Sequence, residues 1–420
     1  MMKLERLRWL ILGLLFLSTV LNYVDRQALS LLLPTLRTEL HLTSADYGVI
    51  TTVFMLAYTI GQIPSGMLLD KIGTRIGFGL FVGLWSVSAL LHAFARGAVS
   101  LGVYRAFLGI TEAGNWPAGG KTVANWFPQK NRAFAMAIFD AGSAIGAIIS
   151  PPIVAFLAMK YGWREAFVAT GSLGIIWLAA WLWIYHEPEN HPWLSAEDRA
   201  TVVQEVGAKT KKSASFSGAL KEIIGARQLW GLFATRFVAT SVWWFYVFWL
   251  PDYLSKGRGF SLLEIGLYAW IPYLTVDIGK MLGGKLSDSM IARGRSVTFA
   301  RKSVMVGGAL AMLGGLCVVS APNAAASIAW ASLATFGFGM WSANILALHA
   351  DIFSPNTMGT AVGFTGTGAS LGGAVFTYVV GQVVDSSGYT PVFYMVGLLA
   401  MVACLILLFG VGKIERIAQT

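Results

Sequence analysis

The chain contains few charged residues and few cysteines. Asp, Glu, Lys and Arg make up 12% of its 420 residues, whereas an average soluble domain has roughly 25%. The only two cysteines, Cys317 and Cys404, lie in apolar runs, and the five histidines show no metal-ligand spacing. A disulfide framework is therefore excluded. Because nucleophile–base pairs and nucleotide-binding loops are also missing, we expect neither an enzyme nor a bound metal or cofactor.

Apolar residues and glycine are abundant instead. The sequence is 56% hydrophobic with 47 glycines, and its mean hydropathy is +0.64. About 20 apolar residues span the hydrocarbon core of a bilayer, and small residues let membrane helices approach closely. The pattern predicts an all-α membrane protein of twelve transmembrane helices in two pseudo-symmetric six-helix bundles. The predicted spans are 9–34, 47–70, 76–95, 99–122, 132–159, 165–186, 227–251, 264–287, 302–321, 324–347, 358–383 and 389–412.

The basic residues indicate the orientation of the chain. Lys and Arg gather in alternate loops, on the side that holds both termini, which is the distribution of cytoplasmic loops. We therefore expect both termini in the cytoplasm. The net charge of +10 then reflects topology, and no nucleic-acid partner is expected.

A long polar segment divides the chain. We expect an N-terminal bundle at 1–190, a cytoplasmic linker at 191–226 and a C-terminal bundle at 227–420. Ser195 with Asp198 resembles a helix N-cap, so a short surface helix is predicted after it.

The two halves repeat a loop motif. GMLLDKIGTRIG at 66–77 follows the second predicted span, and GGKLSDSMIARGRS at 283–296 follows the eighth. Each contains a small residue, an apolar pair, an aspartate and a basic cluster. We expect Asp70, Arg75 and Asp288 to latch the interface between the bundles rather than to touch substrate.

Four ionisable residues lie in the middle of the first half. Asp25 and Arg26 are on the first predicted span, and Arg105 and Glu112 share one face of the fourth, two turns apart. A charge at that depth costs several kcal/mol unless it is paired or faces water. These residues therefore either serve function or form a structural ion pair.

Four motifs resemble one family. They are NYVDR (22–26), GQIPSGMLLDKIG (61–73), TEAGNWPAG (111–119) and WFPQKNRAFAMAIF (126–139). With the repeated loop and the central linker, the chain resembles the major facilitator superfamily over its whole length. Within it, the motifs resemble the anion:cation symporter family, and bacterial hexuronate and aldonate transporters in particular.

The resemblance implies roles for individual residues. Asp25 and Glu112 match the proton carriers of the family, and Arg26 matches the arginine that binds the substrate carboxylate. Tyr23 and Tyr58 match positions that line the sugar-acid site, although they are equally consistent with helix packing. Arg105 either contacts substrate or holds Glu112 charged. The other candidate substrate contacts are Ser143, Trp244, Asn344, Thr365 and Ser370.

Part of the fifth predicted span departs from the pattern of sugar-acid carriers. Asp140 stands where we expect asparagine, and Ser143 stands where a galactonate-type carrier would have an amide. We expect Asp140 to pair with Lys121, either as an inner gate or as a structural tie. Asp277 and Lys280 are one turn apart and should neutralise each other. His349 is interpreted as a residue at the edge of a loop.

The sequence therefore predicts a proton-coupled symporter that imports a small organic anion, such as a hexuronate or aldonate, by alternating access. The expected location is a bacterial inner membrane, and the expected state is a monomer. Exchange or efflux of another organic anion or a drug is the alternative, and sodium coupling stays open. A transporter-like sensor would need a larger cytoplasmic domain than the linker provides.

Overall fold

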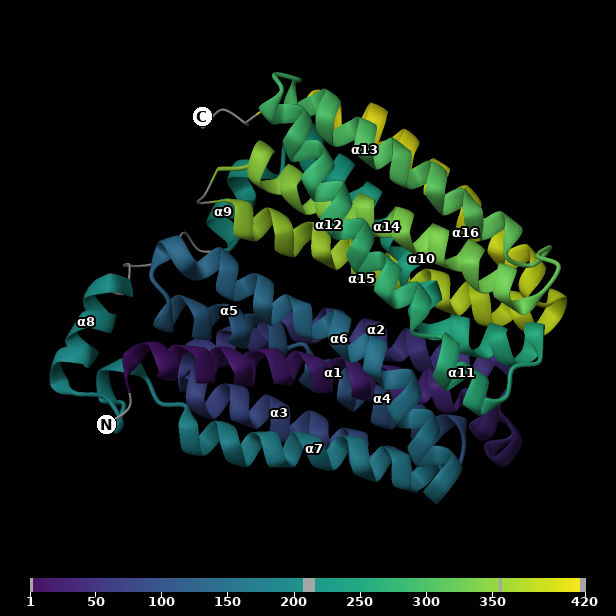
Figure 1. The fold of residues 1–420 in the computed structure, drawn as a ribbon, viewed down its shortest axis with the longest axis horizontal. Helices are drawn as coiled ribbons and strands as arrows, with labels where there is room; N and C mark the ends of the chain where they lie inside the picture. Colours follow the sequence, from purple (N-terminus) through teal and green to yellow (C-terminus); the bar gives the residue numbers. More distant parts are fainter. Residues whose placement is uncertain (1–2, 207–215, 355–356, 416–420) are drawn as a thin grey trace. The chain divides into compact units, whose positions relative to one another are not determined.

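The computed structural model describes residues 3–206, 216–354 and 357–415, and every regular element in these ranges is a helix (Figure 1). Residues 207–215 of the predicted linker lie outside the described residues. Eight of the described helices are long and apolar enough to cross a membrane. They are α1 (Leu4–Leu40), α2 (Ser44–Ile72), α3 (Thr74–Leu91, continued by a 3-10 turn), α6 (Gln129–Tyr161), α7 (Trp163–Ile184), α14 (Ala324–Ile352), α15 (Met358–Ser387) and α16 (Tyr389–Leu405).

The other four predicted spans are also helical, but they are interrupted or more polar. They correspond to α4 (Ala98–Glu112) with α5 (Asn115–Trp126), α10 (Arg227–Arg258), α11 (Leu262–Tyr268) with α12 (Ile271–Ala292), and α13 (Val297–Met312) with the 3-10 segment Leu313–Cys317.

Prolines explain the two breaks. Pro117 lies in the first turn of α5 and Pro272 in the first turn of α12. Proline has no N–H group and cannot donate to the carbonyl four residues earlier, so a new helix begins there more easily than an old one continues. Each of the predicted spans 99–122 and 264–287 is therefore formed by two helices. As a result, Glu112 is the last residue of α4.

The described chain forms two compact units, which we call unit 1 (Met1–Leu42 and Val53–Lys211) and unit 2 (Thr43–Thr52 and Lys212–Thr420). In unit 1, α1 packs against α6 and α7, and α3 lies beside α7 (Figure 1). Two buried indoles connect these helices. Trp177 Nε1 donates to the Leu14 carbonyl at 2.8 Å, and Trp181 Nε1 donates to the Arg75 carbonyl at 3.0 Å.

In unit 2, α14 packs against α12 and α13, and α10 packs against α15 and α16. Unit 2 also includes the first turns of α2, whose free N–H groups need acceptors. Asp385 on α15 provides them: its two carboxylate oxygens accept from the Ser44 and Ala45 N–H groups at 2.8 and 2.7 Å.

Two short helices follow unit 1's last span, α8 (Ala196–Val206) and α9 (Phe216–Ile223). The predicted cap of α8 is confirmed, because Ser195 Oγ accepts from the Asp198 N–H at 3.0 Å. Arg8 binds Glu205 at 2.6 Å, and Arg132 donates to the Val206 carbonyl at 3.3 Å. The helix is therefore attached to unit 1.

Glycine permits the close approach of α14 to α12. A Cβ atom on Gly339 would lie 2.0 Å from the Val276 carbonyl oxygen, so no side chain fits without moving the backbone. A Cβ atom on Gly307 of α13, in contrast, would have no heavy atom within 4 Å.

We expect Gly339→Ala to lower the free energy of unfolding by about 1–3 kcal/mol, because the extra methyl group overpacks a backbone contact. Gly307→Ala should be neutral or slightly stabilising. Thermal melts of the two variants in the same detergent measure the difference. Equal melting temperatures for the two would contradict the packing described for α12 and α14.

Candidate functional site

A buried ion pair joins α1 to the end of α4. Arg26 Nε and Nη2 donate to Glu112 Oε2 at 3.0 and 2.7 Å. The arginine side chain is 2% exposed and the glutamate side chain 0%. The other carboxylate oxygen, Glu112 Oε1, has no hydrogen-bond partner among the described residues. Two residues for which separate roles were predicted are thus in direct contact.

Aromatic rings surround the Arg26 guanidinium. Its central carbon lies 5.1 Å from the ring centre of Tyr23, 5.0 Å from that of Tyr58 and 5.3 Å from that of Phe54. Cation–π contacts of this kind add stabilisation where water is excluded. Asn22 Oδ1 also accepts from Nη2 at 3.3 Å. The predicted pair Tyr23 and Tyr58 therefore lies at Arg26, together with Phe54, which the sequence did not single out.

Arg105 supports the same site from α4. Its Nη2 donates to the backbone carbonyl of Arg26 at 3.1 Å, and its guanidinium carbon lies 5.6 Å from the Phe54 ring centre. The direct hydrogen bonds to Glu112 come from Arg26, and a role for Arg105 in holding Glu112 charged or in contacting substrate stays a prediction. The contact with the Arg26 carbonyl fixes α1 at the residue that binds Glu112.

Asp25 differs from its neighbour. It is 2% exposed, and neither of its carboxylate oxygens has a hydrogen-bond partner among the described residues. Gln27 is fully buried, and neither its amide nitrogen nor its amide oxygen has a hydrogen-bond partner among the described residues. Sequence reasoning missed Gln27, although its place beside a charged pair in an apolar span was a usable signal.

The residues predicted for gating form other contacts. The Lys121 ammonium lies 2.9 Å from Asp70 Oδ1 and 2.7 Å from the Leu69 carbonyl oxygen, so the predicted pair with Asp140 is wrong. Asp70 lies in the last turn of α2, and its contact with α5 is a tertiary one that linear spacing could not show. Arg75 donates to the Leu182 carbonyl at 2.5 Å. Asp140 is exposed on α6, and Ser143 is buried there.

The predicted substrate contacts of the second half lie in unit 2. Asn344 Nδ2 on α14 donates to the Gly283 and Met340 carbonyls at 3.2 and 2.9 Å. The Trp244 ring on α10 stacks on Phe248 at 5.4 Å. Ser370 and Thr365 are buried on α15. The predicted pair of Asp277 with Lys280 is confirmed at 3.0 Å.

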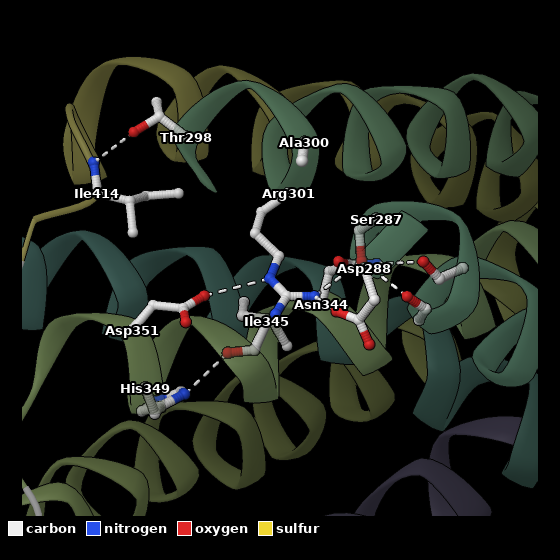
Figure 2. Close-up of polar contacts among 12 residues, drawn as sticks. Ser287, Asp288, Thr298, Ala300, Arg301, Asn344, Ile345, His349, Asp351 and Ile414 are labelled. Atoms are coloured by element: carbon white, nitrogen blue, oxygen red, sulfur yellow. Dashed lines mark hydrogen bonds and ion pairs between the residues drawn. The ribbon is translucent and has the colours of Figure 1, made fainter. Parts of the chain in front are cut away.

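Asp288 is bound by an arginine from α13. Figure 2 shows Arg301 between Asp288 and Asp351, with nitrogen–oxygen distances of 2.7 and 3.2 Å. The same guanidinium donates to Ser287 Oγ at 2.8 Å. This cluster ties the ends of α12 and α14 to α13. A role for Asp288 in latching the two halves stays a prediction.

His349, which we interpreted as a residue at the edge of a loop, lies in the last turn of a helix. It is fully buried on α14, where Nδ1 contacts the Ile345 carbonyl at 2.8 Å (Figure 2) and Nε2 contacts Thr365 Oγ1 at 2.8 Å. Arg236 on α10, which the sequence did not single out, donates to the same threonine oxygen at 3.0 Å. The difference arises because α14 continues to Ile352, beyond the predicted end at 347.

The sequence model of the Major Facilitator Superfamily matches residues 15–377 and 296–419. The chain belongs to the major facilitator superfamily. The resemblance drawn from the four motifs is thereby confirmed. Because the members of this superfamily are transporters, the chain is a membrane transporter and not an enzyme.

Relatives within the superfamily align along nearly the whole chain. The hexuronate transporter of Escherichia coli K12 is 34% identical over 97% of this chain and 94% of its own length. A probable galactarate/D-glucarate transporter of Bacillus subtilis is 31% identical over 99% and 94%. The D-galactonate transporter of an Escherichia coli O6:H1 strain is 29% identical over 98% and 97%.

Two solved structures share the fold. A bacterial homologue of the human lysosomal transporter Spinster, inward-facing and unoccupied, superposes with a TM-score of 0.77 at 18% identity, covering 96% of this chain and 95% of its own. A D-xylose–proton symporter has a TM-score of 0.74 at 16% identity, with 96% and 98% covered.

The buried pair predicts a strong energetic coupling between α1 and α4. Removing one partner leaves the other charge buried without compensation. We therefore expect Arg26→Met to lower the melting temperature more than the double variant Arg26→Met/Glu112→Gln does. A double-mutant cycle on the purified transporter should give a coupling of about 1–3 kcal/mol.

The matched control is the half-exposed pair of Arg164 and Glu39, at 3.6 Å. The same cycle there should give less than about 1 kcal/mol. Equal coupling energies at the two pairs would contradict the view that burial makes the contact between Arg26 and Glu112 the stronger one.

Proposed function

We propose that this transporter imports a sugar acid, of the hexuronate or aldonate class, together with protons and by alternating access. The names of the relatives support the substrate class, since they are hexuronate, galactarate/D-glucarate and D-galactonate transporters. The contact between Arg26 and Glu112 supports the coupling to protons.

The proposal includes an arrangement in the membrane. Twelve transmembrane helices form two six-helix halves, 1–190 and 227–420, joined by the linker 191–226. Both termini face the cytoplasm of a bacterium, because Lys and Arg gather in the loops on their side. The protein works as a monomer, with the site inside its helical bundles.

The coupling follows from competition for one guanidinium. A carboxylate substrate and Glu112 both suit the planar fork of Arg26, which binds carboxylates in a bidentate manner. When the substrate carboxylate binds Arg26, Glu112 loses its cationic partner and becomes a buried, uncompensated charge. A proton on Glu112 removes that penalty. Binding of the anion therefore promotes binding of a proton, and by linkage the proton promotes binding of the anion.

The geometry leaves room for this exchange. Glu112 Oε2 faces Arg26, while Oε1 has no hydrogen-bond partner among the described residues and is the atom that receives the proton. Asp25 is the second carrier. A buried ionised carboxylate without hydrogen bonds is costly. Binding a proton removes this cost for Asp25, which is adjacent to Arg26 on α1.

The role of Glu112 is tested by uptake of radiolabelled galacturonate into energised vesicles. We expect Glu112→Gln to reduce gradient-driven accumulation at least ~10-fold and to leave counterflow exchange active, because an amide mimics the protonated carboxyl but cannot release a proton. Glu39→Gln, at an exposed pair, is the control and should accumulate normally.

A protonophore should abolish wild-type accumulation, and removal of sodium should not change it. Accumulation that survives the protonophore but needs sodium would show sodium coupling. Accumulation that is unchanged in Glu112→Gln would contradict the proposed carrier, and export of the acid from loaded vesicles alone would favour the efflux alternative.

A further inference from the structure

One arginine in unit 2 lies inside a long helix rather than at its end. Arg236 is in the third turn of α10 and is half-buried. Its Nη1 donates to Thr365 Oγ1 at 3.0 Å and to the Val362 carbonyl at 3.2 Å, both on α15. Both acceptors are neutral, and within the described part of the chain no carboxylate lies within ion-pair distance of this guanidinium.

Two other arginines of unit 2 are bound to groups that account for a structural role. Arg301 is held by Asp288 and Asp351. Arg227 donates to the Phe409 and Gly410 carbonyls at the end of the last helix. Carboxylates and C-terminal carbonyls are the acceptors expected for a guanidinium that has a structural role.

A hydrogen-bonded chain fixes the Arg236 side chain. The Ile345 carbonyl can only accept, so His349 Nδ1 carries a hydrogen and donates to it. A guanidinium 3.0 Å from Thr365 Oγ1 disfavours a second cation on the far side of that oxygen. The imidazole is therefore neutral, and its Nε2 at 2.8 Å and the Ala361 carbonyl oxygen at 2.9 Å are both acceptors for the single hydrogen of the Thr365 hydroxyl. Because that hydrogen points to one of these acceptors, the threonine oxygen keeps a lone pair that accepts from Arg236.

Within the described residues, only Nη1 of the Arg236 guanidinium donates hydrogen bonds. Nε and Nη2 of Arg236 have no hydrogen-bond partner among the described residues, and they are not sealed from solvent. These two groups are parallel donors on one side of a planar fork, which is the geometry that binds a carboxylate through both oxygens.

We infer that Arg236, oriented by Thr365 and His349, binds the carboxylate of the transported acid in unit 2, as a second anion-binding residue that holds this single carboxylate at a different step of transport from Arg26. This inference rests on the proposed transport of sugar acids. Arg236 is the binding residue, whereas Thr365 and His349 position it.

The test measures galacturonate binding to purified transporter by isothermal titration calorimetry, with the melting temperature of each variant recorded in parallel. We expect Arg236→Gln to weaken binding about 10- to 100-fold, the range of a charge-assisted hydrogen bond. Arg236→Lys should recover part of the affinity, because it keeps the charge without the fork. Thr365→Val should weaken binding less than Arg236→Gln, since it removes only the positioning contact.

Two controls separate binding from structure. Arg227→Gln removes a helix-end arginine and should leave the affinity unchanged even if it lowers the melting temperature. The uncharged methyl ester of galacturonate should bind the wild type and Arg236→Gln equally weakly. Wild-type affinity in Arg236→Gln, or an equal loss for the acid and its ester, would overturn the inference.

If Arg236→Gln does not fold, Arg236→Cys provides a second measurement. A cationic methanethiosulfonate reagent should label this cysteine and raise the affinity for galacturonate, and galacturonate should slow the labelling. Labelling that the acid does not slow would overturn the inference. A wild type that neither binds nor accumulates any sugar acid would instead contradict the proposed function, so the two failures are distinguishable.

Discussion

The buried ion pair between Arg26 and Glu112 is the constraint around which the site in unit 1 is arranged. Neither charge is tolerable alone among apolar helices, and together they are acceptable only with good geometry and further contacts. The structure provides both: two short hydrogen bonds to one carboxylate oxygen, rings of Tyr23 and Tyr58 on the guanidinium, and Arg105 on the Arg26 carbonyl. A contact between a guanidinium and a carboxylate is also one that an anionic substrate can replace.

The arginines inside the two units have different partners. In unit 1 the central guanidinium is neutralised by a carboxylate from the same unit. In unit 2 the arginine inside α10 binds a hydroxyl and a carbonyl, whereas Arg301 binds the carboxylates of Asp288 and Asp351. An arginine that has no carboxylate partner in the described chain is a group that an anionic ligand can neutralise.

Glycine and proline place these groups. Gly339 lets the backbone of α14 touch that of α12, and Gly109 lets α4 touch α2 at the Phe54 carbonyl, close to the aromatic wall of the site. Pro117 begins a new helix just after Glu112. The proton-carrying candidate therefore stands at a helix end, where the backbone is irregular but enclosed by protein, as membrane interiors require.

Much of this protein could be predicted from the sequence. The apolar spans, the repeated loop with Asp70 and Asp288, and the ionisable residues Arg26 and Glu112 follow from composition, hydropathy and spacing, which are local properties. The partners of these residues could not be predicted. That Glu112 meets Arg26, that Lys121 meets Asp70, and that His349 is buried against Thr365 depend on distances between helices remote in sequence, and only the tertiary packing of the two units sets those distances.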